Sequence, residues 1–202
     1  MIERDLISYI ISAYDRPRIL RACLATLSVQ TEPHELIVCC NSLQQCQIDM
    51  HREVANEFGA KCYWTGKWGA ACCYSSAEMV IERGHVHGDW LVFPSDDSLY
   101  VGRFSEIMMR AAREKRWDLV YCNMVYESAM PLSNYHYGDL EVEAKLGRID
   151  KTGILLRRPW FKKFPGKNPT GSFAMCDGKL IEELIAREIR HGKAPGRLVV
   201  HQ

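Results

Sequence analysis

The stretch LISYIISAYDRPRILRACLATLSVQT, residues 6–31, predicts a buried strand followed by an amphipathic helix. Residues 6–12 form a short apolar run rich in isoleucine, which is typical of a strand covered on both faces. Turn-forming residues follow at 14–17, and from Arg18 the chain has the pattern of a helix. One face of this helix is apolar and consists of Leu20, Cys23, Leu24 and Leu27. A strand, a turn and a helix in this order are the repeating unit of α/β domains.

The same alternation continues along the chain. Further strands are expected at 35–40, 60–64, 89–93 and 118–122, and helices between them at 48–59, 70–81 and 104–112. A strand-like segment at 149–158, a final helix at 177–192 and a last strand at 196–202 complete the pattern. Because parallel neighbours need long return connections, we predict an α/β domain with a mostly parallel central sheet covered by helices on both faces.

The bulk composition fits one domain spanning residues 1–202. The chain is 47% hydrophobic and 25% charged, which is the profile of a soluble globular protein. It contains no apolar run near the roughly 20 residues that span a bilayer, and its start has no secretory-signal pattern. The nine cysteines are odd in number and include no CxxC pair, so we expect reduced thiols rather than disulfides or a structural zinc site. These features predict a cytoplasmic protein.

The charges are balanced overall but not locally. The 26 basic and 25 acidic residues provide no global attraction to nucleic acid. Residues 151–176, however, contain no acidic residue and six basic ones: Lys151, Arg157, Arg158, Lys162, Lys163 and Lys167. This segment is either a site for a phosphate-bearing ligand or a solvated basic face.

The segment FPSDDSLY, residues 93–100, places two carboxylates directly after an apolar strand. Two like charges about 4 Å apart cost roughly 4 kcal/mol at an effective dielectric constant near 20, and about 1 kcal/mol in water. A cation or solvent must therefore be near Asp96 and Asp97, although the pair also fits an ordinary turn. Because parallel strands end at a common edge, Tyr14 and Asn41 should lie beside them.

Five segments together resemble the family 2 glycosyltransferases of the GT-A fold, which use nucleotide sugars. The opening SYIISAYDRPRILRACLATLSVQT is similar to the family's first strand and helix. The segments ELIVCCNS, GDWLVFPSDDSLY, AMCDGKLIEEL and LVVHQ follow in the family's order. The resemblance implies an inverting transfer of a sugar, with a uridine diphosphate sugar as the favoured donor, to an acceptor hydroxyl.

The resemblance also implies a divalent metal ion, Mn²⁺ or Mg²⁺, that neutralises the departing diphosphate. Asp97 is the expected direct metal ligand, and Asp96 is expected to contact the ribose, the sugar or metal-bound water. The histidine of LVVHQ, His201, is expected to reach back to the metal or the diphosphate, and imidazole would favour Mn²⁺. A histidine near a terminus also fits an ordinary surface position.

The resemblance places the catalytic base at Asp177, which would take the proton of the acceptor hydroxyl. Cys176 precedes it, where the family commonly has glutamate. A cap of the last helix is the alternative role for the same carboxylate.

Donor binding is assigned by resemblance to the residues after the first two strands. Ala13, Tyr14 and Asp15 would meet the base and ribose, and Arg16 would lie near the phosphates. The family's acidic residue at the end of the second strand is replaced here by Cys39 and Cys40 before Asn41, which leaves Asn41 or backbone groups to meet the base.

The chain then divides into a donor-binding half, 1–122, and an acceptor-binding half, 123–202. Five aromatic residues of the second half offer flat faces for stacking on an acceptor: Tyr126, Tyr135, Tyr137, Trp160 and Phe161. Two alternatives stay open, a non-catalytic relative that binds a nucleotide or a glycan, and an enzyme that glycosylates nucleic acid. A sugar-nucleotide pyrophosphorylase is disfavoured because AYDRP is not a glycine-rich phosphate loop.

Overall fold

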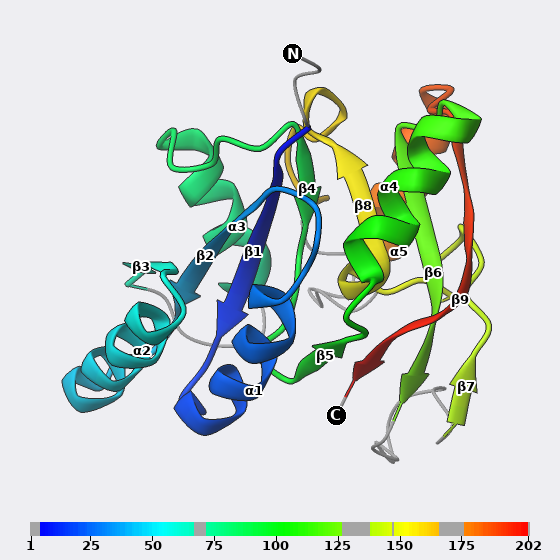
Figure 1. The fold of residues 1–202 in the computed structure, drawn as a ribbon. Helices are drawn as coiled ribbons and strands as arrows, with labels where there is room; N and C mark the ends of the chain where they lie inside the picture. Colours follow the sequence, from blue (N-terminus) through cyan, green and yellow to red (C-terminus); the bar gives the residue numbers. More distant parts are fainter. Residues whose placement is uncertain (1–4, 67–71, 127–137, 147, 166–175, 202) are drawn as a thin grey trace.

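The first half of the chain forms the predicted parallel sheet (Figure 1). A computed structural model describes residues 5–66, 72–126, 138–146, 148–165 and 176–201. Four parallel strands pair in the order β3-β2-β1-β4. They are β1 (Ile7–Ala13), β2 (His34–Cys40), β3 (Lys61–Trp64) and β4 (Trp90–Val92). Every residue of β1 is buried, as its continuous apolar run predicts.

The second half extends this sheet with strands of both directions. The order continues from β4 through β8, β6 and β9 to β5, and β7 pairs with β6. The bounds are β5 (Ser98–Tyr100), β6 (Leu119–Tyr126), β7 (Gly138–Leu140), β8 (Ile154–Arg157) and β9 (His191–His201). β6 and β9 are parallel, while β8 is antiparallel to both of its neighbours and β5 is antiparallel to β9. Most strands of the described sheet therefore run in one direction, as predicted.

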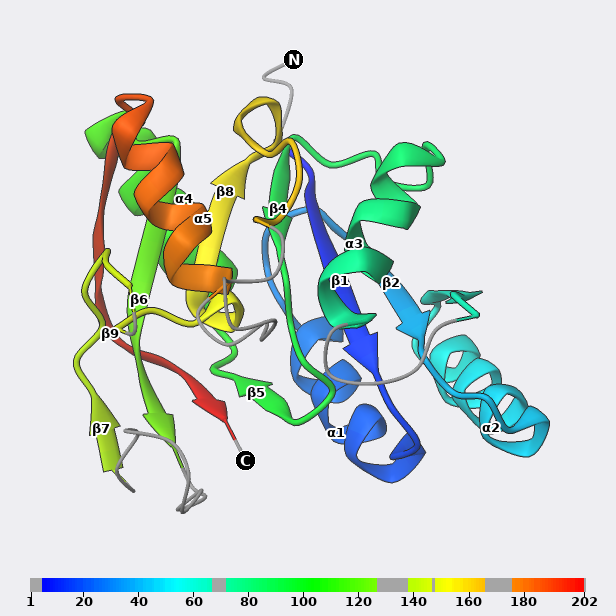
Figure 2. The same cartoon turned by 180° about the vertical axis from the view of Figure 1, so that it is seen from behind.

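Helices cover both faces of the sheet. α1 and α4 lie on one face, with α2 beside α1, and α3 and α5 lie on the other (Figures 1 and 2). The bounds are α1 (Pro17–Ser28), α2 (Gln45–Glu57), α3 (Cys72–Glu82), α4 (Phe104–Lys115) and α5 (Cys176–Ala186). Two short 3₁₀ helices, η1 (Lys151–Gly153) and η2 (Arg158–Trp160), flank β8. Within the described residues, none of the helices has both the length and the apolarity needed to cross a membrane.

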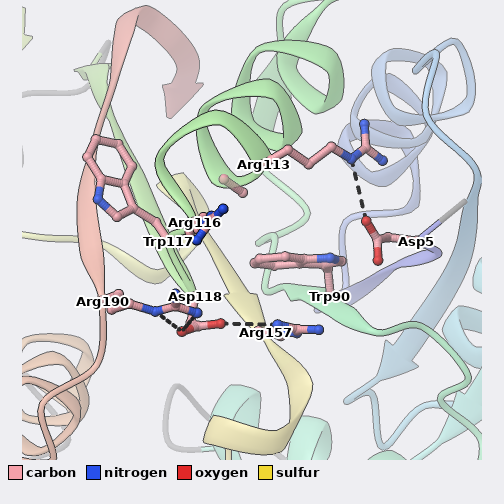
Figure 3. A pocket seen from close by; sticks show the side chains of 9 residues that line it. Asp5, Trp90, Arg113, Arg116, Trp117, Asp118, Arg157 and Arg190 are labelled. Atoms are coloured by element: carbon pink, nitrogen blue, oxygen red, sulfur yellow. Dashed lines mark hydrogen bonds and ion pairs between the residues drawn. The ribbon is translucent and has the colours of Figure 1, made fainter.

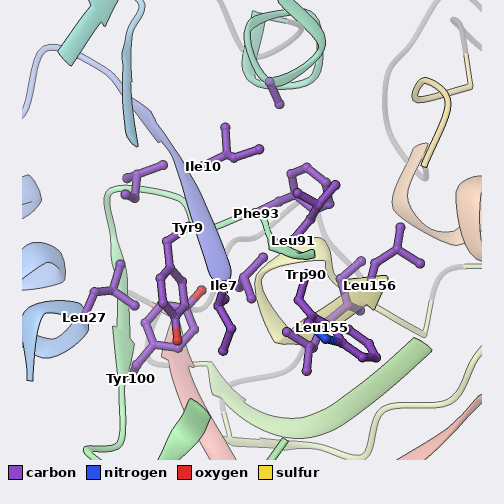
Figure 4. Packing of buried hydrophobic residues seen from close by; sticks show 14 of the residues in the cluster. Ile7, Tyr9, Ile10, Leu27, Trp90, Leu91, Phe93, Tyr100, Leu155 and Leu156 are labelled. Carbon is purple, nitrogen blue, oxygen red and sulfur yellow. The ribbon is translucent and has the colours of Figure 1, made fainter. Parts of the chain in front are cut away.

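The core fills the space between the sheet and these helices (Figure 4). Ile10, Leu27 and Leu91 have no exposed surface, and Phe93 is 1% exposed. Burying a side chain of this size contributes about 1.5–3 kcal/mol. The helix positions predicted from the apolar spacing of residues 20–27 are those that α1 buries.

The structure differs from the sequence prediction at the end of the chain. The last helix was expected to continue to residue 192, but α5 ends at Ala186. Glu188 has a left-handed backbone (φ 61°), which ends the helix and turns the chain back. His191 then pairs with Leu119 of β6, so β9 is longer than its predicted range. The short strands β5 and β7 were not predicted either, because three residues are too few to show a period.

Candidate active site

The ends of β1, β2 and β4 meet at one edge of the sheet, as predicted. The N–H of Asn41 donates to the carbonyl of Ala13 over 2.9 Å. The N–H of Asp96 donates to the carbonyl of Ser12 over 3.0 Å, and the N–H of Tyr14 donates to Asp96 Oδ2 over 2.9 Å. Two backbone hydrogen bonds, and a third from a backbone N–H to the Asp96 carboxylate, thus join three segments that are distant in sequence.

Arg16 supplies the cation that the two adjacent carboxylates require. Its guanidinium pairs with Asp96 Oδ1 through Nη2 and with Asp97 Oδ2 through Nη1, the latter at 3.0 Å. The Asp96 side chain is fully buried, and burial raises the pKa of its carboxyl group, while the Tyr14 N–H and the nearby Arg16 act in the opposite direction. A bridging arginine therefore offsets the repulsion between the two carboxylates.

His201 lies beside Asp97, as expected. The imidazole Nδ1 is 3.5 Å from Asp97 Oδ1 and 3.1 Å from the hydroxyl of Ser98. The cause is the pairing of β5 with β9, in which Ser98 is opposite His201. This pairing brings the C-terminal histidine back to the twin acids across about a hundred residues of sequence.

The residues at this edge fit a metal ion shared with a ligand, but not a metal site made of protein groups alone. Asp97 Oδ1 is buried and accepts no hydrogen bond from the described residues, and the His201 imidazole is next to it. Among the described side chains, no three His, Cys, Asp or Glu residues gather as a metal-binding cluster. Mg²⁺ and Mn²⁺ commonly take only one or two protein ligands and complete their shell with phosphates and water, which matches this pair.

Asp177 lies in the first turn of α5 and contacts a different element. Its Oδ2 accepts the backbone N–H of Lys151 over 3.0 Å. Burial and the charge of Asp150 raise its pKa to about 6, while the Lys151 charge and a hydrogen bond from Tyr74 limit the rise. A carboxylate with a pKa just below neutrality is ionised at pH 7 and still basic enough to take a proton.

Asp150 was not among the expected site residues, and Lys151 was expected either in a phosphate site or on a solvated basic face. The Lys151 side chain is buried, and its Nζ donates to the carbonyl of Phe93 over 3.1 Å and to Ser95 Oγ over 3.0 Å. It is therefore not part of a solvated basic face. Although burial acts in the opposite direction, the charges of His201 and Lys151 lower the pKa of Asp150, which also accepts the Thr152 N–H over 2.8 Å.

Lys151 links the twin acids to Asp177. The Lys151 side chain donates to Ser95, the residue before Asp96, and its backbone N–H donates to Asp177. The only sequence signal was a lysine just before the apolar segment ILL, a position where a charge needs partners.

The predicted base-binding residues differ in exposure. Ala13 is buried, Tyr14 is half-buried and Asp15 is exposed. Asn41 is fully buried, and its Oδ1 accepts hydrogen bonds from the hydroxyls of Thr65 and Ser76, both over 2.6 Å. Its Nδ2 has no hydrogen-bond acceptor among the described residues. Asn41 thus joins β2 to its neighbours, and its contact with a base stays a prediction.

The predicted acceptor-binding aromatics are only partly described. Phe161 is 8% exposed and packs against Phe93 and Phe164, with ring centroids 5.2 and 5.0 Å away, so it belongs to the core. Trp160 is half-buried, and the guanidinium of Arg187 lies 5.4 Å from its ring centroid. The side chain of Tyr126 and the residues Tyr135 and Tyr137 lie outside the described part of the chain.

The cysteines whose side chains are described are free thiols, as predicted. Cys39 is fully buried at the end of β2, and its Sγ donates to the carbonyl of Ser76 over 3.7 Å. Burial raises the pKa of this thiol. Cys39 acts there as a small core residue.

The fold is of the GT-A type, a mostly parallel sheet with helices on both faces, as in the solved structures that match it. No protein-family model and no curated protein sequence matches the chain. Among solved structures, the crystal structure of S. aureus TarS 1–349 aligns with a TM-score of 0.73 and 14% identity, over 97% of this chain and 60% of that one. The same protein in complex with UDP-GlcNAc aligns with a TM-score of 0.70 and 12% identity, over 96% and 57%.

A second protein has the same fold. The mannosyltransferase PcManGT from Pyrobaculum calidifontis, in complex with GDP-Man and Mn²⁺, aligns with a TM-score of 0.71 and 16% identity, over 99% of this chain and 57% of that one. The chain therefore spans about 60% or less of the length of these structures. At these identities the likeness establishes the α/β fold, a sheet flanked by helices.

Proposed function

We propose that the chain is a glycosyltransferase that moves a sugar from a nucleoside diphosphate sugar to an acceptor hydroxyl with inversion. The observation that carries the proposal is the convergence of Arg16, Asp97 and His201 at one sheet edge. Lys151 connects this group to Asp177, so the edge combines charged groups that could meet a leaving group with a basic carboxylate.

In this proposal residues 1–122 hold the donor and residues 123–202 hold the acceptor. The exposed Asp15 and half-buried Tyr14 would contact the ribose or the base, and Asp96 supports the loop that they share. Asn41 Nδ2, which has no acceptor within the described residues, would donate to a base carbonyl. A uridine diphosphate sugar is our first choice of donor, and the UDP-GlcNAc complex of the TarS structure supports it. The GDP-Man complex of PcManGT keeps a guanine nucleotide as the second choice.

Asp177 would act as the general base. The acceptor oxygen forms a bond to the anomeric carbon, the bond from that carbon to the diphosphate oxygen breaks, and the acceptor proton passes to Asp177. Asp97 and His201 would hold Mn²⁺ or Mg²⁺, which stabilises the charge on the diphosphate leaving group when it is bound. Arg16 would meet the same charge by turning one N–H from the carboxylates to a phosphate oxygen.

The experiment is an assay of donor cleavage with Mn²⁺ and a panel of nucleotide sugars that includes UDP-GlcNAc and GDP-mannose. We expect turnover with at least one donor, and a loss of about 100-fold or more in Asp97→Asn and Asp177→Asn. Asp89→Asn is the matched control, because Asp89 is exposed and lies at the start of β4, at the other edge of the sheet. Equal activity in all three variants would refute the proposed roles.

A second candidate function is a relative that binds a nucleotide sugar without turning it over. The observation that favours it is that Arg16 already pairs with both carboxylates, so the pair is neutralised without a metal ion. Calorimetry separates the two functions. Micromolar donor binding without cleavage across a broad acceptor panel would favour the binding protein.

A further inference from the structure

A polar pocket lies at the ends of the strands opposite to those that meet the twin acids (Figure 3). It has a volume of about 230 Å³. Its main lining residues come from the end of α4 and from the ends of β4, β8, β6 and β9 that face away from the twin acids. They are Trp90, Arg113, Arg116, Asp118, Arg157 and Arg190.

The strand register separates this pocket from the candidate active site. Trp90 begins β4, and its neighbour on β1 is Ile7, the first residue of that strand. The candidate active site begins at the other end of β1, where Tyr14 follows Ala13 and binds Asp96. Six steps of about 3.3 Å along the strand place the two sites roughly 20 Å apart. Arg157 is paired with Trp90 in the antiparallel ladder, so it cannot clasp the phosphates of a donor bound at the twin acids.

Asp118 holds two arginines of the pocket in place. Arg190 donates from Nε and Nη2 to Asp118 Oδ2, over 3.0 and 2.9 Å, and Arg157 donates from Nη1 to Oδ1 over 3.4 Å. Figure 3 shows the two guanidinium groups on either side of this carboxylate. A guanidinium has five N–H donors, so most donors of both arginines are left for a ligand. The carboxylate is buried and fixes their position.

The pocket also contains a cation, Arg116, that has no partner among the residues that the structure describes. Arg116 ends α4 with a left-handed backbone, and its side chain forms no hydrogen bond or ion pair with any described residue. Arg113, in contrast, pairs with Asp5 at 3.4 Å and with Glu32 at 3.0 Å. Arg116 thus adds positive charge that no protein group in the described part of the chain neutralises.

Trp90 forms a wall of the pocket and has an unsatisfied donor. The residue is 5% exposed, and its indole N–H is buried with no hydrogen-bond acceptor in the described structure. Such groups are normally paired, since leaving a buried donor unpaired costs stability. The guanidinium of Arg157 lies 5.9 Å from the ring centroid, where the aromatic face favours a cation. In Figure 3 the nitrogen edge of the ring faces the side of Asp5.

We propose that this pocket binds the phosphate group of a small ligand at a site separate from the donor site. Arginines arranged as forks match the oxygens of a phosphate, and three of them, Arg116, Arg157 and Arg190, have donors to spare. The volume is below the roughly 300–1,000 Å³ of pockets that enclose drug-sized ligands, so a phosphate monoester fits and a whole nucleotide sugar does not. The site would let the chain respond to phosphate or to a phosphorylated metabolite without competition from the donor.

The test is a titration of the ¹⁵N-labelled full chain, followed by NMR through the indole N–H signals. Trp90→Phe identifies the Trp90 signal. The probes are inorganic phosphate, glycerol 3-phosphate and a single-stranded oligonucleotide, each compared with sodium chloride at equal ionic strength. We expect a saturable shift of the Trp90 signal with the two small phosphates and none with chloride.

Variants locate the site. Arg157→Gln and Arg116→Gln should each weaken phosphate binding by about tenfold, the loss expected for one charge-assisted hydrogen bond. Arg116→Gln removes no described contact, so its effect cannot come from misfolding. Arg103→Gln, which changes an exposed arginine whose only ion-pair partner in the described part of the chain is Glu106, should bind phosphate normally. Phosphate binding that all three variants retain, or a shift that chloride reproduces, would overturn the proposal. Tight oligonucleotide binding that is lost in Arg157→Gln would overturn the assignment to a small ligand.

Discussion

Replacing Asp177 with asparagine should stabilise the protein at neutral pH while removing its proposed activity. The folded structure raises the pKa of this carboxyl group from 3.8 to about 6, chiefly by burial and by the charge of Asp150. The folded state therefore holds the proton more tightly than the unfolded state does. As the pH rises from about 4 to about 6, the unfolded chain loses this proton first, and stability falls. Asparagine has no such proton and no charge to bury.

The size of the effect follows from the two pKa values. Their difference of about 2 pKa units corresponds to about 3 kcal/mol of unfolding free energy above pH 6. This amount is an upper limit, because Asp150 and Asp177 titrate together. For a domain of this length it corresponds to a rise in Tm of about 6–12 °C. The asparagine Oδ1 can still accept the Lys151 N–H, so the hydrogen bond is retained.

The assay is urea unfolding of the wild type and the Asp177→Asn variant, followed by circular dichroism at pH 4 and at pH 7.5. We expect a clear stabilisation of the variant at pH 7.5 and little difference at pH 4. Asp89→Asn, at an exposed position, should match the wild type at both pH values. A variant that is no more stable than the wild type at pH 7.5, or one whose advantage is the same at both, would refute the reasoning.

Three further predictions concern other parts of the structure. Arg16→Gln should destabilise the fold by about 2 kcal/mol in urea unfolding, because it leaves the buried carboxylate of Asp96 without its cation. The loss is smaller than the 3–5 kcal/mol of a fully buried pair, since the arginine is half-exposed. Unchanged stability would mean that solvent screens the pair. Gly192→Ala should destabilise by about 1–3 kcal/mol and alter the near-ultraviolet dichroism, since the added Cβ would lie 2.2 Å from the Trp117 ring; a wild-type Tm would contradict this. In the pH profile of kcat/KM, the acidic limb should have an apparent pKa of about 6. Lys151→Met should move this limb to higher pH, because the lysine charge lowers the pKa of the proposed base, and an unmoved limb would exclude that coupling.

The local elements could be predicted wherever one physical rule decides them. β1 is an uninterrupted apolar run and is buried along its whole length, and α1 buries the side chains that recur at the helical spacing. The α/β fold followed from the alternation of such segments. The end of α5 could not be predicted in this way, because the apolar pattern continues past Ala186 to Ile189, which packs in the core after the chain has turned at Glu188.

The candidate site was only partly predictable. The rule that parallel strands end at one edge of a sheet predicts from sequence alone that Tyr14, Asn41 and Asp96 lie close together. The same rule said nothing of Lys151, whose charge suggested solvent but whose side chain is buried. The rule also gives no position for Arg157, which the strand register places beside Trp90, at the ends of the strands away from the twin acids.

The sequence by itself therefore determined the class of fold and the residues that end the first strands, since both depend on contacts between near neighbours and on the repeat of each element. The resemblance already implied that His201 reaches the twin acids, but only the tertiary structure decided that Lys151 joins them to Asp177 and that the arginines form a separate pocket. These outcomes depend on which strands pair and in which direction. Pairing is set by the free energy of the whole sheet and its core, and no short segment contains that information.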